Sequence, residues 1–375
     1  MASTFRERYL KALLFGEPDR IPLMPGEPRE STLRAWRVQG LPEGMDYFQA
    51  VLAELGVKSV IPSIRVIADP FKMTPAFEEK VLAHKNGHYL VQDCMGAVTE
   101  ISDCYDYTYL RTPKDFVTRR WHKFPVETRD DWEQMKERYR VDAPGRFGGV
   151  AEICRQPAPR EFLLSVDFNG PFWQLREWCG LKNLCLLFAD EPDLVREMVE
   201  FWEEFVSQVL TRVLSEAKAD RVRVSEDMAY KAHSIISPAM IRQFLLPTYR
   251  RWVSEVRNAG CPIVDVDSDG YIGELLPLWI EAGINMCEPI EVAAGNDVVA
   301  YRKLYGKQMA YFGGIDKRAI AAGGAVLEAE VMRVVPPLIE DGGFIPSCDH
   351  GVPPDISWQN YLAYSKLLAR LCGWI

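Results

Sequence analysis

From residue 192 to residue 351 the sequence alternates between segments typical of helices and segments typical of strands. The clearest helix is expected at 192–217, where apolar residues recur every three or four positions and form one stripe. The further helices are expected at 238–259, 272–282, 296–305 and 325–340, and the strands at 220–227, 262–267, 284–291, 308–316 and 344–351. Strands that alternate with helices of this length predict βαβ units and a parallel sheet.

At least four such units in a chain of 375 residues favour an α/β fold of the (β/α)8 TIM-barrel type over an open doubly wound sheet. No GxGxxG motif follows an early strand, which leaves a dinucleotide-binding fold with little support. We predict a single barrel domain over residues 1–375, with regular units over 151–375. Residues 1–150 are assigned to an amino-terminal extension plus the first strand, and "GEPDRIPLM" resembles an early strand with Arg20 at its entrance.

The composition excludes several classes of protein. A net charge of -9 argues against a nucleic-acid binder, and no run approaches the roughly 18 apolar residues of a membrane helix. The nine cysteines are scattered and form no CxxC pair, which favours a reducing compartment. The N-terminus reads as an amphipathic helix and lacks a signal-peptide pattern. We therefore expect a cytoplasmic protein with no nucleic-acid or membrane partner.

Polar side chains gather where the predicted strands end. Chemistry in a parallel barrel takes place at the carboxyl ends of the strands, so these residues are candidates for a common cleft. They are Asp167 and Asn169, Glu226 and Asp227, Asp267 and Asp269, Glu288 and Glu291, Asp316 and Lys317, and Cys348, Asp349 and His350. The pattern predicts a small-molecule site that is rich in carboxylates, with one thiol and one imidazole.

Structural alternatives stay open for several of these carboxylates. Asp269 before Gly270 is compatible with a simple turn, and Asp316 is compatible with a helix N-cap. Glu226 could pair with an arginine. Asp267 is harder to explain structurally, because a charge that ends an apolar strand must be paired or bound.

Three further side chains have neighbours that suggest a role in the site. His350 is the one histidine of five that follows a predicted strand beside acidic and thiol neighbours. Cys348 lies two positions before it, and such a thiol can be held as thiolate or bind a metal; inert packing is the alternative. Trp173, in "FNGPFWQLREWCG", could form a flat wall for an aromatic ligand, although core packing explains it equally well.

Four stretches together resemble the uroporphyrinogen decarboxylase superfamily: "PDRIPLM", "DSDG", "GGIDKR" and "GGFIPSCDHGVPPDISWQNY". The resemblance covers nearly the whole chain and implies a (β/α)8 barrel; relatives also imply a homodimer. The His-Gly-x-x-Pro-Asp loop of the decarboxylases matches "HGVPPD" (350–355). Their Arg-Gln-Ala-Gly-Arg stretch is missing, because "PGEPRESTLRAW" holds only Arg29 and Arg34 at that place.

The corrinoid-linked methyltransferases and O-demethylases form the other branch of this superfamily, and the chain resembles them more. The resemblance places their His-x-Cys-Gly zinc motif on Asp267-Ser268-Asp269-Gly270 and their late cysteine on Cys348. The expected metal ligands are therefore Asp267, Asp269, Cys348 and Glu288, a set in which carboxylates replace softer ligands.

The sequence thus predicts a methyltransferase that moves a methyl group from a small methoxylated substrate to a corrinoid protein, with metal or acid assistance. The expected catalytic residues are Asp267, His350 and Glu226, and the expected substrate-binding residues are Arg20, Asp167, Trp173 and Asp316. The alternatives are a decarboxylase acting on uroporphyrinogen or another carboxylated substrate, and a ligand-binding barrel without catalysis.

Overall fold

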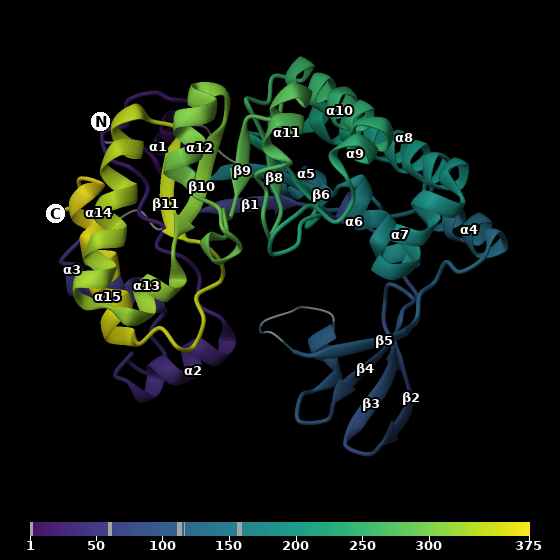
Figure 1. Ribbon diagram of the computed structural model, residues 1–375, viewed down its shortest axis with the longest axis horizontal. Coiled ribbons are helices and arrows are strands. Elements are labelled where there is room, and N and C mark those ends of the chain that lie inside the picture. The colour runs from purple at the N-terminus through teal and green to yellow at the C-terminus, as the bar shows by residue number, and fades with distance from the viewer. Residues whose placement is uncertain (1–2, 59–61, 111–114, 116, 156–159) are drawn as a thin grey trace.

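The core of the protein is a seven-stranded parallel sheet that curls into a half-barrel (Figure 1). The computed structural model describes residues 3–58, 62–110, 115, 117–155 and 160–375. The strands, in their order across the sheet, are β1 (Ile64–Ile67), β6 (Leu163–Asn169), β7 (Arg221–Ser225), β8 (Ile263–Asp267), β9 (Met286–Glu288), β10 (Ala310–Ile315) and β11 (Phe344–Cys348). The predicted parallel α/β architecture is confirmed, but the described strands do not close into an eight-stranded ring.

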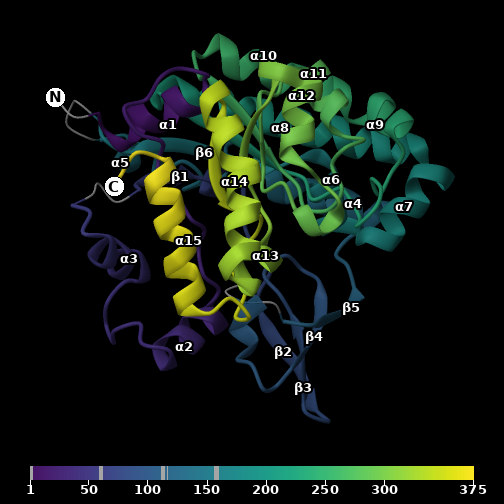
Figure 2. The ribbon, with the colours of Figure 1, turned by 60° about the vertical axis from the view of Figure 1, so that its left-hand side comes forward.

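The helices cover the convex side of this sheet, and Figure 2 shows α14 and α15 side by side near β11. They are α5 (Val150–Cys154), α6 (Pro171–Cys179), α7 (Leu181–Asp190), α8 (Pro192–Glu216), α9 (Pro238–Phe244), α10 (Leu246–Asn258), α11 (Leu276–Ala282), α12 (Val298–Tyr305), α13 (Lys317–Ala322), α14 (Gly324–Asp341) and α15 (Trp358–Leu371). The helix expected at 238–259 is divided at Leu245, two residues before Pro247. None of the helices in the described ranges is long and apolar enough to cross a membrane.

The segment expected as an early strand, "GEPDRIPLM", is not a strand in the structure. It leads into a stretch that runs beside β11, where the Cys348 N–H donates to the Pro25 carbonyl at 3.2 Å. Pro22 and Pro25 have no N–H to donate, so a regular ladder cannot form here. This is one reason why the described strands do not close into a ring between β11 and β1.

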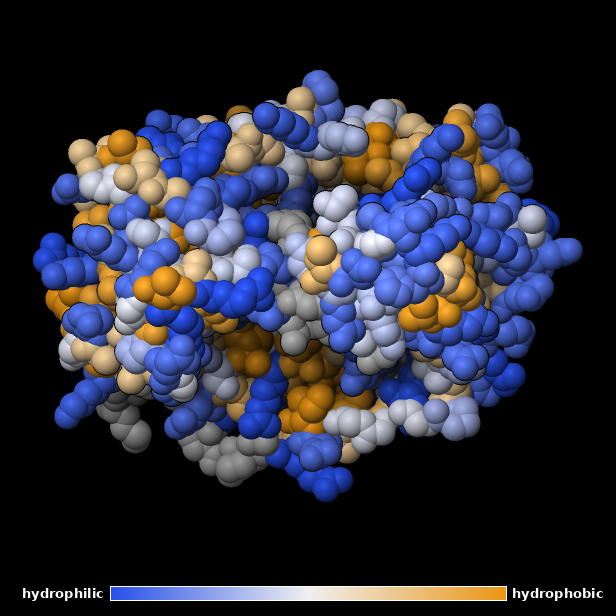
Figure 3. Space-filling model, turned by 90° about the horizontal axis from the view of Figure 1, so that it is seen from below, coloured by the Kyte–Doolittle hydropathy of each residue, from blue (hydrophilic) through white to orange (hydrophobic). Residues whose placement is uncertain are grey.

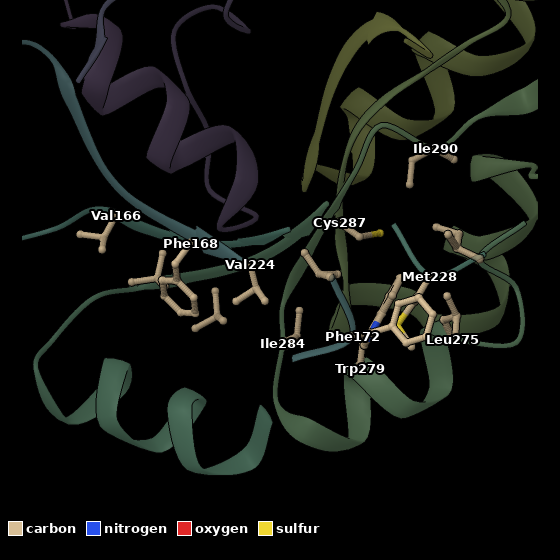
Figure 4. Packing of buried hydrophobic residues seen from close by; sticks show 14 of the residues in the cluster. Val166, Phe168, Phe172, Val224, Met228, Leu275, Trp279, Ile284, Cys287 and Ile290 are labelled. Carbon is tan, nitrogen blue, oxygen red and sulfur yellow. The ribbon is translucent and has the colours of Figure 1, made fainter. Parts of the chain in front are cut away.

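The two faces of the sheet have opposite character. Side chains alternate along a strand, so neighbouring residues point to opposite faces. The outer face packs on the helices, and Figure 4 shows part of this apolar cluster, including Val166, Phe168, Val224 and Cys287. The inner face instead carries charged residues on β6, β7, β8 and β9, which are described with the site below.

A short N-terminal helix, α1 (Phe5–Leu13), packs against the N-terminal ends of the strands. It begins with a capping box between Thr4 and Glu7. Its apolar side, including Tyr9 and Leu13, forms a second core with inward-facing residues of the strands. Those residues are Leu163, Ile263, Met286, Ala310 and Ile345. The amphipathic helix predicted from the sequence therefore covers this end of the half-barrel.

A four-stranded antiparallel sheet in the first part of the chain was not predicted. Its strands are β2 (Lys80–Lys85), β3 (His88–Gln92), β4 (Val98–Ser102) and β5 (Arg119–Lys123), in sequential order. The remaining helices are α2 (Glu30–Val38), α3 (Tyr47–Leu55) and α4 (Arg129–Lys136), and short 3-10 helices are η1 (Asp69–Phe71), η2 (Tyr107–Leu110), η3 (Glu137–Tyr139), η4 (Val292–Ala294) and η5 (Gly306–Gln308). Because the antiparallel sheet follows β1, it stands at the carboxyl-terminal ends of the barrel strands.

Candidate functional site

The candidate site lies where the parallel strands end, between α2 and the antiparallel sheet β2–β5 (Figure 1). Figure 3 looks onto this face, which is hollowed between the two halves of the molecule and has apolar atoms in part of the recess. Carboxyl ends of parallel strands meet at one edge, so the predicted strand-end residues come together here. We call this edge the mouth.

Arg221 forms the deepest charged layer of the inner face. Its guanidinium donates to Ser165 Oγ at 3.0 Å, to the Tyr9 hydroxyl at 3.2 Å and to Asp265 Oδ2 at 3.5 Å, and it lies 3.7 Å from Glu288 Oε1. Burial and the neighbouring Glu288 raise the pKa of Asp265 well above its ordinary value. The two arginines of the interior outweigh burial at Glu288 and lower its pKa. Of the two carboxyl groups, Asp265 therefore favours the protonated form and Glu288 the ionised form.

Arg223 forms the next layer toward the mouth and faces three carboxylates. Its Nη2 donates to Asp267 Oδ2 at 2.6 Å, its Nε lies 2.8 Å from Glu288 Oε1, and its Nη1 lies 3.9 Å from Asp167 Oδ2. The strand register brings these side chains together, because Asp167 is opposite Arg223 on the neighbouring strand and Glu288 is opposite Asp267. Burial raises the pKa of Asp267 to about 6, against the opposing effect of Arg223.

Asp269 and His350 form a hydrogen-bonded acid–base pair at the mouth. His350 Nε2 lies 3.0 Å from Asp269 Oδ2, and the Gly351 N–H donates to Nδ1 at 2.7 Å, so the proton of the neutral imidazole sits on Nε2. The hydrogen bond to Asp269 raises the pKa of His350. Burial acts to raise the pKa of Asp269, but His350 lowers it overall. Gly270 fits because a Cβ there, at φ +79°, would lie 2.5 Å from a backbone oxygen of the neighbouring loop.

Two further cations at the mouth already have carboxylate partners. Lys317 Nζ lies 3.2 Å from Glu291 Oε1. Arg176 Nη1 donates to Asp227 Oδ2 at 3.0 Å. Together with Arg223, these two side chains each face an acid, and Arg29 lies at the same edge, where its charge acts to lower the pKa of His350.

Glu226, predicted as catalytic, is fully buried behind the site rather than exposed in it. Its carboxyl accepts hydrogen bonds from the Trp173 N–H at 3.0 Å and from the Tyr249 hydroxyl. It therefore satisfies backbone donors at the start of α6, where Gly170 has no side chain to do so. A Cβ on Gly170 would lie 2.1 Å from the Glu226 carboxyl carbon. Burial raises the pKa of Glu226 to about 7, and these contacts favour a structural role.

Cys348 points away from the predicted metal ligands. Ile345, on the same strand, belongs to the inner core, so the alternation of β11 turns Cys348 to the outer core beside Tyr361 and Tyr364. Its Cβ is also close to Gly26, where an added Cβ would lie 2.9 Å away. Burial raises the pKa of the Cys348 thiol to about 12. The alternative of inert packing fits these contacts.

The four predicted substrate-binding residues are divided by the structure. Asp167 faces Arg223, and the Trp173 ring lies 4.1 Å below the guanidinium of Arg176, so both belong to the mouth. Asp316 caps α13 and pairs with Arg318, as the structural alternative predicted. Arg20 stacks on Trp374, with its guanidinium 5.1 Å from the ring centroid, and precedes the segment that runs up to the mouth.

The predicted zinc ligands do not fit a zinc site. Asp267 and Glu288 both contact the guanidinium of Arg223, Asp269 contacts His350, and the Cys348 thiol faces the outer core. Among the residues that the structure describes, no three histidine, cysteine, aspartate or glutamate side chains are grouped to hold a metal ion. Zinc binding stays a prediction of the resemblance, and we derive no chemical step through a metal.

The sequence analysis missed the two arginines of β7, Arg221 and Arg223, that organise the inner face. The signal was present in "RVRVS" (221–225), where arginines alternate with valines on a central strand. The next strand, "IVDVD", alternates aspartates in the same way. Because β7 and β8 pair in parallel, the two polar faces must coincide.

The comparisons with known proteins agree with this fold. Residues 119–370, more than half of the chain, match the family model described as Uroporphyrinogen decarboxylase (URO-D). A uroporphyrinogen decarboxylase of Geobacter sulfurreducens is 21% identical over 68% of this chain and 74% of that protein. One from Syntrophotalea carbinolica is 26% identical over 41% of this chain and 42% of that protein. A solved methyltransferase from Methanosarcina mazei aligns with a TM-score of 0.59 at 14% identity, covering 98% of this chain and 99% of that one.

Proposed function

Because the chain belongs to the uroporphyrinogen decarboxylase family, we propose that it is a methyltransferase working at the mouth of the half-barrel. In this proposal it moves a methyl group from a small, uncharged methoxylated compound to a corrinoid carried by a partner protein. The corrinoid would supply the nucleophile that accepts the methyl group. The chain itself binds the methyl donor and provides a proton for the oxygen that leaves.

The Asp269–His350 pair carries this proposal. When the bond between the methyl carbon and the ether oxygen breaks, the electron pair stays on oxygen, and the resulting alkoxide or phenoxide needs a proton. The acid form of the pair carries one proton more than a neutral imidazole beside an ionised Asp269, and the hydrogen bond to Asp269 favours this form by raising the pKa of His350. Transfer of that additional proton to the leaving oxygen produces an alcohol or phenol and leaves the neutral imidazole, and solvent then restores the acid form.

The charges around the pair also support methyl transfer from an uncharged donor. Arg176, Arg223 and Lys317 each face at least one carboxylate within 3.2 Å. A substrate with many carboxylates is normally gripped by cations that are available to it. The arrangement suits an uncharged donor better, with the stacked Arg176 and Trp173 as one wall.

Decarboxylation is the second candidate, because the two curated relatives carry that name and "HGVPPD" resembles the decarboxylase loop. One preparation can separate the two reactions. The purified chain is incubated without oxygen with cob(I)alamin and methoxylated arenes, and methylcobalamin is followed by absorbance and the phenol by chromatography. The proposal predicts both products. It also predicts that His350→Gln lowers the rate at least about a hundredfold, as for loss of a general acid. Release of CO₂ from uroporphyrinogen without any methyl transfer would favour the decarboxylase.

A further inference from the structure

Arg223 differs from the other cations of the mouth in how many acids surround it. Arg176 and Lys317 lie at the rim, with their nearest carboxylates at 3.0 and 3.2 Å. Arg223 projects from the middle strand of the inner face, where its guanidinium lies within 3.9 Å of three carboxylates: Asp167, Asp267 and Glu288. If all three are ionised, the single charge of Arg223 faces three negative charges, of which the one on Glu288 is shared with Arg221 at 3.7 Å.

The outermost of the three acids is Asp267. Its side chain is 30% exposed, against 18% for Asp167 and 9% for Glu288. It is bound to Nη2 of Arg223 at 2.6 Å, and the Arg223 side chain is itself 29% exposed, so the two groups reach the mouth together.

We propose that Arg223 and its three acids determine the charge of the substrate, so that the mouth accepts uncharged or cationic compounds and rejects carboxylates. This inference rests on the proposed function for its substrate, since it names the class of methyl donor. The physical reason is electrostatic. An approaching carboxylate is repelled by the acids around Arg223, because these outnumber the guanidinium in a partly buried site, where charges are weakly screened. Removal of the Asp267 charge should therefore turn Arg223 into a binding group for anions.

The substitution Asp267→Asn is suited to this test because asparagine has nearly the same shape. Its side-chain oxygen can still accept a hydrogen bond from Arg223, but one negative charge is removed beside the guanidinium, which becomes available to a ligand carboxylate. Asp297→Asn is the matched control. Asp297 also faces an arginine, Arg333, at 3.2 Å, but it caps α12 outside the mouth, and asparagine is an equally good N-cap.

Binding of three compounds on one ring provides the readout: 4-methoxybenzyl alcohol, 4-methoxybenzylamine and 4-methoxybenzoate, which are uncharged, cationic and anionic. Isothermal titration without corrinoid keeps the result independent of methyl transfer. We expect the wild type and Asp297→Asn to bind the benzoate most weakly. Asp267→Asn should bind it at least about tenfold more tightly than the wild type does, as expected when one nearby like charge is removed.

Two results would overturn the inference. One is a wild type that binds the benzoate as tightly as the alcohol. The other is an Asp267→Asn variant that is folded, as judged by circular dichroism, but binds the benzoate no more tightly than the wild type does. This result would count whether or not the wild type binds the other two compounds. If Asp267→Asn does not fold, Asp167→Asn removes another charge facing Arg223, at 3.9 Å, and must show the same gain. Absence of methyl transfer would count against the proposed function alone.

Discussion

The two faces of the same strands show how differently a buried surface can be built. On β7, Val222 and Val224 point outward into an apolar core, whereas Arg221 and Arg223 point inward among acids. The outer face gains stability from removing apolar surface from water. The inner face must recover the cost of desolvating charges, and buried ion pairs often recover little more than that cost. The inner face is therefore better explained by function, and the outer face by stability.

The largest effect is expected where a buried charge loses its partner. Arg221→Met leaves Glu288 and the Tyr9 hydroxyl without the guanidinium that they contact. We expect the free energy of unfolding to fall by about 3–5 kcal/mol, as for other broken buried pairs. Urea unfolding followed by circular dichroism measures it. A loss below about 1 kcal/mol would mean that the inner charges are well hydrated and that the contrast between the faces is smaller than described.

Glu226 sharpens the comparison, because it is a carboxyl within the outer layer, held by a hydroxyl and a backbone N–H rather than by a guanidinium. Burial raises its pKa to about 7 from an ordinary 4.5. The folded state thus binds the proton more tightly, and stability falls as pH rises from about 4.5 through 7. This fall amounts to about 3 kcal/mol at most. Glu226→Gln should remove this part of the pH dependence, measured by urea unfolding at pH 5 and pH 8. An equal loss of stability between pH 5 and pH 8 in the wild type and in Glu226→Gln would contradict this expectation.

Val222→Ala is the matched change on the outer face, one residue from Arg221. Val222 is fully buried, and its truncation removes apolar surface and leaves a small cavity. We expect a loss of about 2 kcal/mol in the same urea experiment, with no change in the binding of a methoxylated ligand. If this variant were less stable than Arg221→Met, the ranking of the two faces would be reversed.

The smallest change is expected at the open end of the inner face, where Asp269→Asn should alter pH dependence rather than stability. Asp269 raises the pKa of His350, so the wild-type pair keeps its proton to a higher pH than a free imidazole would. The rate of methyl transfer should fall as pH rises through this raised pKa. In Asp269→Asn the fall should move to lower pH, toward the ordinary value of about 6.5. Single-turnover rates across pH measure this, and superimposable profiles would contradict it.

The sequence predicted the outer layers better than the inner one. Apolar stripes and glycine stops locate α8, β8, α14 and β11 closely, because these signals are local. The pairing of Arg223 with three acids depends on the register between strands and on the face to which each side chain points. The sequence of a single segment determines neither of these. For the same reason the position of Cys348 was not predicted. It is near His350 in sequence, but its side chain points to the outer face of β11. The antiparallel sheet was missed because its short strands lie in a stretch without the βα pattern.

The central claim is that the mouth, where Arg176, Arg223 and Lys317 already face acids, transfers methyl groups from uncharged donors. The most direct test uses one preparation of the purified chain. One part is incubated with an uncharged methoxyarene and cob(I)alamin, and the other part with uroporphyrinogen alone. The account predicts methylcobalamin and phenol in equal amounts from the first, and no CO₂ from the second. Release of CO₂ from uroporphyrinogen, with no methylcobalamin from any methoxyarene, would contradict it.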